Sequence, residues 1–179
     1  MEKQTIPLSV ATRDGEFIAH YSERGLVGLN FPSKQSGQTG APNVTPSARV
    51  RGWHRKTTAA IKDTLAGRAV KNLPPLDFTG GTEFQRAVWQ ALQEIPAGHT
   101  RSYGEIARLI GKPNAVRAVG GACGANPIPV LVPCHRVLAA NHKLGGFSSG
   151  LDWKRKLLRR EGLGVVSFAL AANEPQPVE

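Results

Sequence analysis

The sequence predicts an α/β fold in two parts: a small antiparallel sheet with one helix over residues 1–77, and a helical part over residues 78–179. Three observations support this prediction. Short runs of mixed apolar and polar residues flank an Asp-Gly turn signal near the N-terminus. Residues 73–81 contain two prolines and two glycines, which is typical of a linker. Beyond this linker, apolar residues recur with the period of an α-helix.

The first part is predicted to contain three strands and a helix. The Asp14-Gly15 pair indicates a tight turn between the first two strands, and the third follows Arg24-Gly25. The predicted strands cover residues 6–12, 16–21 and 26–31. Residues 32–46 are rich in Ser, Gly, Gln, Thr and Pro and predict a loop, and residues 47–66 predict a helix that Gly67 closes. Nothing in residues 1–71 indicates chemistry.

The second part opens with three predicted helices. Thr82 and Gln85 form a capping box that begins a helix ending near residue 94. Ser102 and Glu105 form a second box, which begins a short helix through residue 110. A break at residues 111–113 precedes a helix over residues 114–124, with Pro113 suited to its first turn. Two short helices joined by a glycine-containing turn suggest a helix-turn-helix, although many helical hairpins bind no DNA.

The third of these helices is expected to have two distinct faces. One is an apolar stripe of Val116, Val119 and Cys123. The other carries Arg117 together with three glycines, Gly120, Gly121 and Gly124. Glycine inside a helix costs about 1 kcal/mol relative to alanine, so a glycine face indicates close approach of another structure. The residues alone leave open whether that structure is a second helix or a nucleic-acid backbone.

The charge of the chain favours a polyanionic partner. The net charge is +10, and between Ile95 and Asn173 eleven Lys and Arg residues face only three acids. Nucleic acid is the first candidate for such a partner and an anionic membrane surface the second. No apolar run approaches the roughly 18–20 residues of a membrane span, and the first ten residues lack the layout of a signal peptide. We therefore expect a cytoplasmic protein, associated with the nucleoid if it is prokaryotic.

Two cysteines are too few for a structural zinc site of three or four thiolates, and the five histidines show no ligand spacing. We therefore predict no metal site.

A cysteine with a neighbouring histidine is the strongest chemical signal. Residues 126–137 form an apolar run between prolines, predicted as strand-like, that carries Cys134 next to His135. A cysteine nucleophile needs thiolate character, which a nearby base or positive charge provides. His135 can accept the proton, and Arg136 adds positive charge. The alternative is that Cys134 is an inert buried cysteine, as most lone cysteines are.

A histidine base usually needs a group that orients it, and Glu161 is the candidate. It lies at i+8 and i+4 from Trp153 and Leu157, which define the inward face of a predicted helix over residues 150–161. The basic residues of this helix are expected to point mostly elsewhere: Lys154, Arg155, Lys156, Arg159 and Arg160. The alternative for Glu161 is a salt bridge to a neighbouring arginine.

The run Pro133-Cys134-His135-Arg136-Val137 resembles the active-site signature of the O6-alkylguanine-DNA alkyltransferases. The resemblance covers residues 78–164 strongly, and only the layout of the N-terminal part is similar. Further motifs follow in the family's order: Gly81-Thr82, Phe84-Gln85, Val88-Trp89, Ile95-Pro96, Ser102-Tyr103, Arg117-Ala118-Val119-Gly120, Asn126-Pro127-Ile128, Phe147-Ser148 and Leu157-Leu158 with Glu161-Gly162.

The resemblance implies a ribonuclease-H-like N-terminal domain followed by a winged-helix-like DNA-binding domain. It also implies direct repair of O6-alkylguanine, and of O4-alkylthymine, in duplex DNA. Cys134 would accept the alkyl group, His135 would deprotonate it through a water molecule, and Glu161 would hold His135. Because the thioether that forms is stable, each molecule would react once. The protein would act as a monomer without a cofactor, and cooperative binding to DNA stays open.

The resemblance also implies how the lesion is recognised. Tyr103 would donate a hydrogen bond to N3 of guanine, the Ser148 backbone would serve O6, and the carbonyls of Cys134 and Val137 would contact the exocyclic amine. Asn126 would brace the turn before the active-site segment. The remaining residues that it assigns to DNA or substrate are Arg117, which fills the space left by a flipped base, and Gly120, Gly121, Arg136 and Phe147.

The sequence departs from the family pattern at two places. Ser149-Gly150 stand where a glycine pair is common, and Asn141-His142 replace a glycine-containing turn. Three other functions compete with this one. A catalytically silent lesion-binding relative typically has Trp in place of Cys134, a helix-turn-helix regulator leaves Cys134 and Glu161 unexplained, and a thiol hydrolase does not explain the DNA-facing features.

Overall fold

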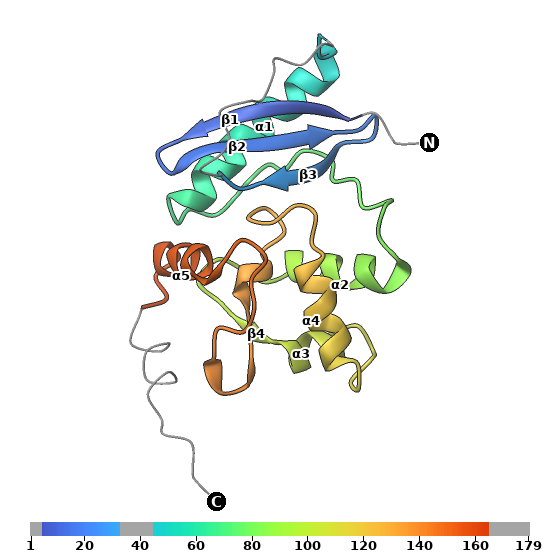
Figure 1. Cartoon of the computed structure of the whole chain (residues 1–179), viewed down its shortest axis with the longest axis vertical. Helices are drawn as coiled ribbons and strands as arrows, with labels where there is room; N and C mark the ends of the chain where they lie inside the picture. The colour runs from blue at the N-terminus through green and yellow to red at the C-terminus, as the bar shows by residue number, and fades with distance from the viewer. Residues whose placement is uncertain (1–4, 33–44, 165–179) are drawn as a thin grey trace, which may run out of the picture.

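The computed structural model describes residues 5–32 and 45–164. It has the predicted α/β architecture, with the sheet and its helix on one side and the helical part on the other (Figure 1). Most of the predicted loop at residues 32–46 lies outside the described residues. In the described part of the chain, no helix is long and apolar enough to cross a membrane.

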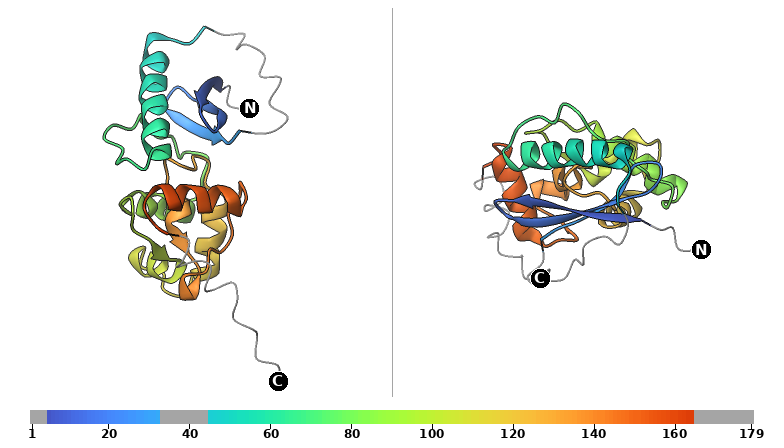
Figure 2. Two further views of the ribbon diagram at one scale, coloured as in Figure 1. Left: turned by 90° about the vertical axis from the view of Figure 1, so that its left-hand side faces the viewer. Right: turned by 90° about the horizontal axis from the view of Figure 1, so that it is seen from above.

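In the first part, residues 5–32 and 45–77 form a three-stranded antiparallel sheet covered by one helix. β1 (Ile6–Thr12), β2 (Gly15–Tyr21) and β3 (Leu26–Asn30) are adjacent in chain order. Helix α1 (Ala48–Leu65) lies along one face of the sheet (Figure 2), and Ser47 caps it by accepting a hydrogen bond from the Val50 N–H. All four elements agree with their predicted ranges to within one residue, because turn and capping residues mark their ends.

The predicted linker is tightly packed against the sheet. The N–H of Leu26 donates to the Pro75 carbonyl at 2.8 Å, and the N–H of Asp77 donates to the Leu26 carbonyl at 2.8 Å. Gly25 makes this approach possible, because a Cβ at this position would lie 2.2 Å from the Pro75 carbonyl oxygen. The connection between the two parts is therefore fixed to the start of β3.

Over its described residues, 78–164, the second part contains four α-helices and a short parallel pair of strands. The helices are α2 (Glu83–Gln93), α3 (Tyr103–Leu109), α4 (Val116–Gly124) and α5 (Leu151–Arg160). Strand β4 (Arg101–Ser102) pairs with β5 (Val137–Leu138), and two 3-10 turns complete this part, η1 (Cys134–Arg136) and η2 (Ala140–His142). Both predicted capping boxes are present, at the starts of α2 and α3.

Two predictions for this part are wrong. Helix α4 begins at Val116 and not at residue 114, because Pro113 lies in a tight turn closed by a 2.9 Å hydrogen bond from the Ala115 N–H to the Lys112 carbonyl. The run at residues 126–137 is not a strand until Val137. Its three prolines lack the N–H that a strand requires, and Val130 has a left-handed backbone with φ of 75°.

Helix α5 is fixed to the sheet by charge and by aromatic packing. Asp14 at the β1–β2 turn accepts hydrogen bonds from Arg160 at 2.6 and 2.9 Å and forms an ion pair with Lys156 at 2.6 Å. The bonds from Arg160 hold the pKa of Asp14 at about 2. Trp153 packs on Phe31 with ring centroids 4.8 Å apart. The buried side chains of both parts form one continuous hydrophobic core, so α5 and Glu161 at its end are held in a defined place.

Candidate active site

A compact turn delivers Cys134 to the interior of the helical part. Asn126 organises this turn, because its side chain donates to the Val132 carbonyl at 2.8 Å and accepts from the Ile128 N–H at 3.0 Å. The Cys134 N–H donates to the Val132 carbonyl at 2.8 Å, which starts η1. These two hydrogen bonds link the start of the turn to the residues just before Cys134.

Cys134 is 4% exposed, and burial raises the pKa of its thiol. A hydrogen bond with Asn126 and the positive charge of Lys154 oppose this effect without reversing it. The resting side chain is thus a neutral thiol, and it needs a base at the moment of reaction. The positive charge of Arg136, which the sequence suggested as the activating group, is engaged elsewhere.

His135 is completely buried and held by Glu161, with 2.9 Å between His135 Nε2 and Glu161 Oε1. A carboxylate can only accept, so Nε2 carries the proton and Nδ1 carries the lone pair. Nδ1 is buried without a hydrogen-bond partner among the described residues. Burial lowers the pKa of His135 more than Glu161 raises it. The geometry therefore supplies a neutral imidazole whose free nitrogen is a base.

Glu161 binds an arginine as well as the histidine, so the two contacts that the sequence suggests for it are both present. Arg136 donates to its two carboxylate oxygens at 2.9 and 3.0 Å and to the Ile95 carbonyl at 2.5 Å. Burial would raise the pKa of Glu161, but the bonds from His135 and Arg136 outweigh it and hold the pKa at about 2. The Arg136 side chain is thus part of the buried network around Glu161.

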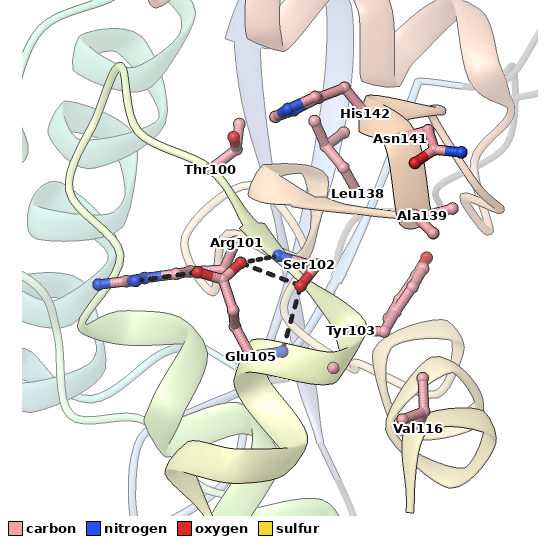
Figure 3. A pocket seen from close by; sticks show the side chains of 12 residues that line it. Thr100, Arg101, Ser102, Tyr103, Glu105, Val116, Leu138, Ala139, Asn141 and His142 are labelled. Carbon is pink, nitrogen blue, oxygen red and sulfur yellow. Dashed lines mark hydrogen bonds and ion pairs between the residues drawn. The ribbon is translucent and has the colours of Figure 1, made fainter. Parts of the chain in front are cut away.

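A cavity of about 670 Å³ lies beside Tyr103, between the start of α3 and the η2 turn (Figure 3). Tyr103 is half-buried, and its hydroxyl lies 3.0 Å from where a Cβ of Gly145 would stand. This close approach and the left-handed φ of 64° at Gly145 both favour glycine there. Burial and the two nearby thiols raise the pKa of Tyr103, which keeps it a neutral donor. Asn141 and His142 line the same cavity with left-handed φ values of 56° and 58°.

The glycine face of α4 is open. Apart from the chain neighbours and the backbone of α4 itself, no described atom lies within 4 Å of a Cβ built on Gly121 or Gly124, and at Gly120 only the Tyr103 ring comes as near as 4.0 Å. This excludes the packing of another described helix against the face. Arg117 is exposed on this helix. The predicted apolar stripe is wrong in one member, because Val116 is 40% exposed while Val119 and Cys123 are buried.

The remaining predicted residues divide between the surface and the core. Ser148 is exposed on the loop before α5, and Phe147 packs edge-on against Phe31 with ring centroids 5.9 Å apart. Val137 is buried in β5, opposite Arg101. In the described part of the chain, no group of three or more His, Cys, Asp or Glu side chains is arranged to hold a metal ion.

The prediction for Lys154, which lies at this site, is wrong. The sequence predicts that it points away with the other basic residues of α5, but it is fully buried and its Nζ donates to the Val137 carbonyl at 2.7 Å. The spacing of Lys154, Leu157, Leu158 and Glu161 at i, i+3, i+4 and i+7 is that of one helix face, and it could have revealed this burial.

The fold and the site define a class of protein: an α/β protein with a helix-turn-helix, an open glycine face on its second helix, and a buried thiol next to a histidine held by a carboxylate. Residues 83–163 match the family described as 6-O-methylguanine DNA methyltransferase, DNA binding domain.

Two relatives and one solved structure extend the match. The methylated-DNA–protein-cysteine methyltransferase of Methanosarcina acetivorans is 63% identical over 149 residues, which are 83% of this chain and 92% of that protein. That of Haemophilus influenzae is 48% identical over 171 residues, 91% and 85% of the two chains. The Mycobacterium tuberculosis OGT, solved in complex with DNA, is 39% identical with a TM-score of 0.69 and covers 86% of this chain and 90% of its own.

This chain belongs to the methylated-DNA–protein-cysteine methyltransferase family, also called the O6-alkylguanine-DNA alkyltransferases. It has the methyltransferase activity of that family in DNA repair, and its helical part is the DNA-binding domain. The resemblance stated from the sequence is confirmed.

Proposed function

We propose that the protein repairs O6-alkylguanine, and O4-alkylthymine, in duplex DNA by transferring the alkyl group to Sγ of its own Cys134. One observation carries this assignment. Cys134 directly precedes His135, whose Nε2–H is held by Glu161 at 2.9 Å while its Nδ1 is buried without a described partner. A neutral imidazole in this tautomer is the base that a buried, protonated thiol requires.

The proposed transfer is a displacement at the alkyl carbon. His135 takes the thiol proton at Nδ1 through a water molecule, and Glu161 stabilises the imidazolium that results. The Sγ–C bond forms as the bond from carbon to O6 breaks, and the electron pair of the broken bond stays on the guanine. The thioether is stable and carries no proton for His135 to remove, so one molecule repairs one lesion. The step balances without a cofactor.

The proposed lesion pocket is formed by side chains and main chain around Tyr103. Tyr103 donates to N3 of the guanine, where a hydrogen bond disperses the charge of the leaving base. The backbone of Ser148 interacts with O6 of the guanine. The carbonyls of Cys134 and Val137 accept hydrogen bonds from its exocyclic amine. The raised pKa of Tyr103 supports its role, because a neutral phenol is a donor throughout the physiological pH range. Asn126 positions the turn that presents Cys134.

Reaction at a buried thiol requires the damaged nucleotide to leave the helical stack. We propose that α4 enters the minor groove, where Gly120 and Gly121 allow close approach to the DNA backbone. Arg117, exposed on the same helix, fills the space that the flipped base leaves. The open surface over Gly121 and Gly124 supports this role, because no described protein segment occupies it.

Replacement of Arg117 by alanine is expected to slow repair of O6-methylguanine in duplex DNA by about tenfold or more, which corresponds to a loss of ~1.4 kcal/mol. The reaction with free O6-methylguanine should be almost unchanged, because a free base needs no flipping. Both rates are measured by single-turnover methyl transfer. Arg159→Ala removes the same charge from an exposed position on α5 and serves as control. Equal slowing of both reactions by Arg117→Ala would contradict the flipping role.

Mapping of the methyl group tests the acceptor assignment. After reaction with a duplex that contains O6-methylguanine, tryptic digestion leaves both cysteines in one peptide, residues 118–136, because no Lys or Arg lies between them. Fragment ions separate the two positions. We expect the methyl group on Cys134 alone, and a methyl group on Cys123 would overturn the proposal.

A further inference from the structure

The mechanism proposed above does not use Lys154, although this residue lies beside the site. Lys154 is fully buried, and a fully buried lysine is rare unless it is paired. Its Nζ donates to the carbonyls of Val137 at 2.7 Å, Gly146 at 3.3 Å and Leu144. No carboxylate among the described residues forms a salt bridge with it. The ammonium therefore sits in a cradle of main-chain carbonyls.

The buried charges around this cradle do not balance in the resting protein. Glu161 contributes one negative charge, and the bidentate bonds from Arg136 compensate it. Burial lowers the pKa of His135, so its ring is neutral. Lys154 then adds one positive charge without a counter-ion, and buried charges are costly unless they are paired. If Cys134 ionises, its negative charge compensates the positive charge of Lys154, and the net charge of the buried site becomes zero.

We propose that Lys154 is a positioning residue for the transfer reaction: its buried ammonium provides the fixed positive charge against which the Cys134 thiol ionises. The same three hydrogen bonds tie β5 to the loop at residues 144–146, which leads to Ser148. Lys154 thus takes the electrostatic role that the sequence suggested for Arg136. This inference rests on the proposed function of Cys134 as the alkyl acceptor.

The titration behaviour of the surrounding groups agrees with this geometry. Burial raises the pKa of Cys134, and the charge of Lys154 acts in the opposite direction. Burial lowers the pKa of Lys154 to about 8, although negative charge at Cys134 and Cys123 acts to raise it. The positive charge of Lys154 also helps to keep His135 neutral. The groups that couple to Lys154 are therefore Cys134 and His135 on η1 and Cys123 on α4.

The experiment measures the pH dependence of Cys134 alkylation by iodoacetamide, with fragment ions separating Cys134 from Cys123. Wild-type protein is compared with Lys154→Arg, which keeps the charge, and with Lys154→Gln, which keeps a donor without charge. In Lys154→Gln we expect the pH midpoint of Cys134 to rise by about one unit, which reduces the rate at pH 7.5 about tenfold. Lys154→Arg should retain most of the wild-type profile. A folded Lys154→Gln variant with the wild-type profile would overturn the proposal.

A second measurement does not depend on the folding of Lys154 variants. The Cε resonance of Lys154 in ¹³C-lysine-labelled protein is titrated in wild type and in Cys134→Ser, which cannot form the thiolate. Because coupling is reciprocal, Lys154 should lose its proton at lower pH in Cys134→Ser. Identical titration in both proteins would contradict the proposal. Neither measurement involves DNA, so a failure of methyl transfer to Cys134 would be seen separately from a failure of this inference.

Discussion

Methyl transfer is expected to disappear completely when Cys134 is replaced by alanine, because no other group in the site can form a thioether with the alkyl carbon. The variant should still bind duplex DNA as tightly as the wild type, since Arg117 and the open glycine face of α4 are unchanged. Transfer is measured as the loss of label from DNA that carries O6-[methyl-³H]methylguanine, and binding by titration of the same duplex.

Cys123→Ala is the matched control, because Cys123 is the other buried thiol. Burial raises the pKa of Cys123 to about 12, so it is not expected to react. Its replacement should leave the amount of methyl transferred unchanged. Residual transfer in Cys134→Ala would contradict the assignment of the acceptor, and lost DNA binding would mean that Cys134 has a structural role.

Replacement of Glu161 by glutamine is expected to lower both stability and the rate of transfer. Glu161 is 1% exposed at its side chain and joins His135 to Arg136, so the variant leaves a buried guanidinium without its counter-ion. Breaking a buried pair in this way costs about 3 kcal/mol of unfolding free energy or more. His135 also loses the carboxylate that fixes its tautomer, which should slow transfer by about a hundredfold.

The acid dependence of stability gives an independent signature of Glu161. Its pKa is about 2 in the folded protein against an ordinary value of 4.5, so its contribution is complete above pH 4.5 and is lost as the pH falls towards 2. Urea unfolding of wild type between pH 6 and 3 should show this loss, and Glu161→Gln should lack that part of it.

Asp152→Asn removes an exposed carboxylate from the same helix and is the control, with little change expected in either stability or transfer. A Glu161→Gln variant as stable and as active as wild type would contradict the role of this network.

The sequence predicted most of the fold because its boundaries carry strong local signals. Ser47, Thr82 and Ser102 each accept the backbone hydrogen bond expected of a helix cap. The predicted start of α4 is wrong because Pro113 suits both the first turn of a helix and a tight turn. Packing against the rest of the protein decides between the two. The strand predicted over residues 126–137 is wrong for a similar reason. Its apolar residues are buried, but burial alone does not distinguish a strand from a compact turn.

The sequence predicts which residues form the candidate site better than it predicts the partners of the charged ones. Cys134, His135 and Glu161 follow from a motif and a helix face, and the structure brings the last two into direct contact. The partners of Arg136 and Lys154 could not be read from the sequence, because both depend on segments distant along the chain. Arg136 binds the carboxylate of Glu161 at the end of α5, and Lys154 binds carbonyls of a loop without regular structure.

Intact mass after reaction with excess duplex containing O6-methylguanine tests the central claim most directly. The account predicts a gain of about 14 Da, the replacement of one hydrogen by a methyl group, that saturates at one methyl per protein molecule because the thioether is stable. Repeated turnover without a change in protein mass would contradict transfer to the protein itself. Tight lesion binding with no gain in mass would instead indicate a lesion-binding protein that does not carry out the transfer.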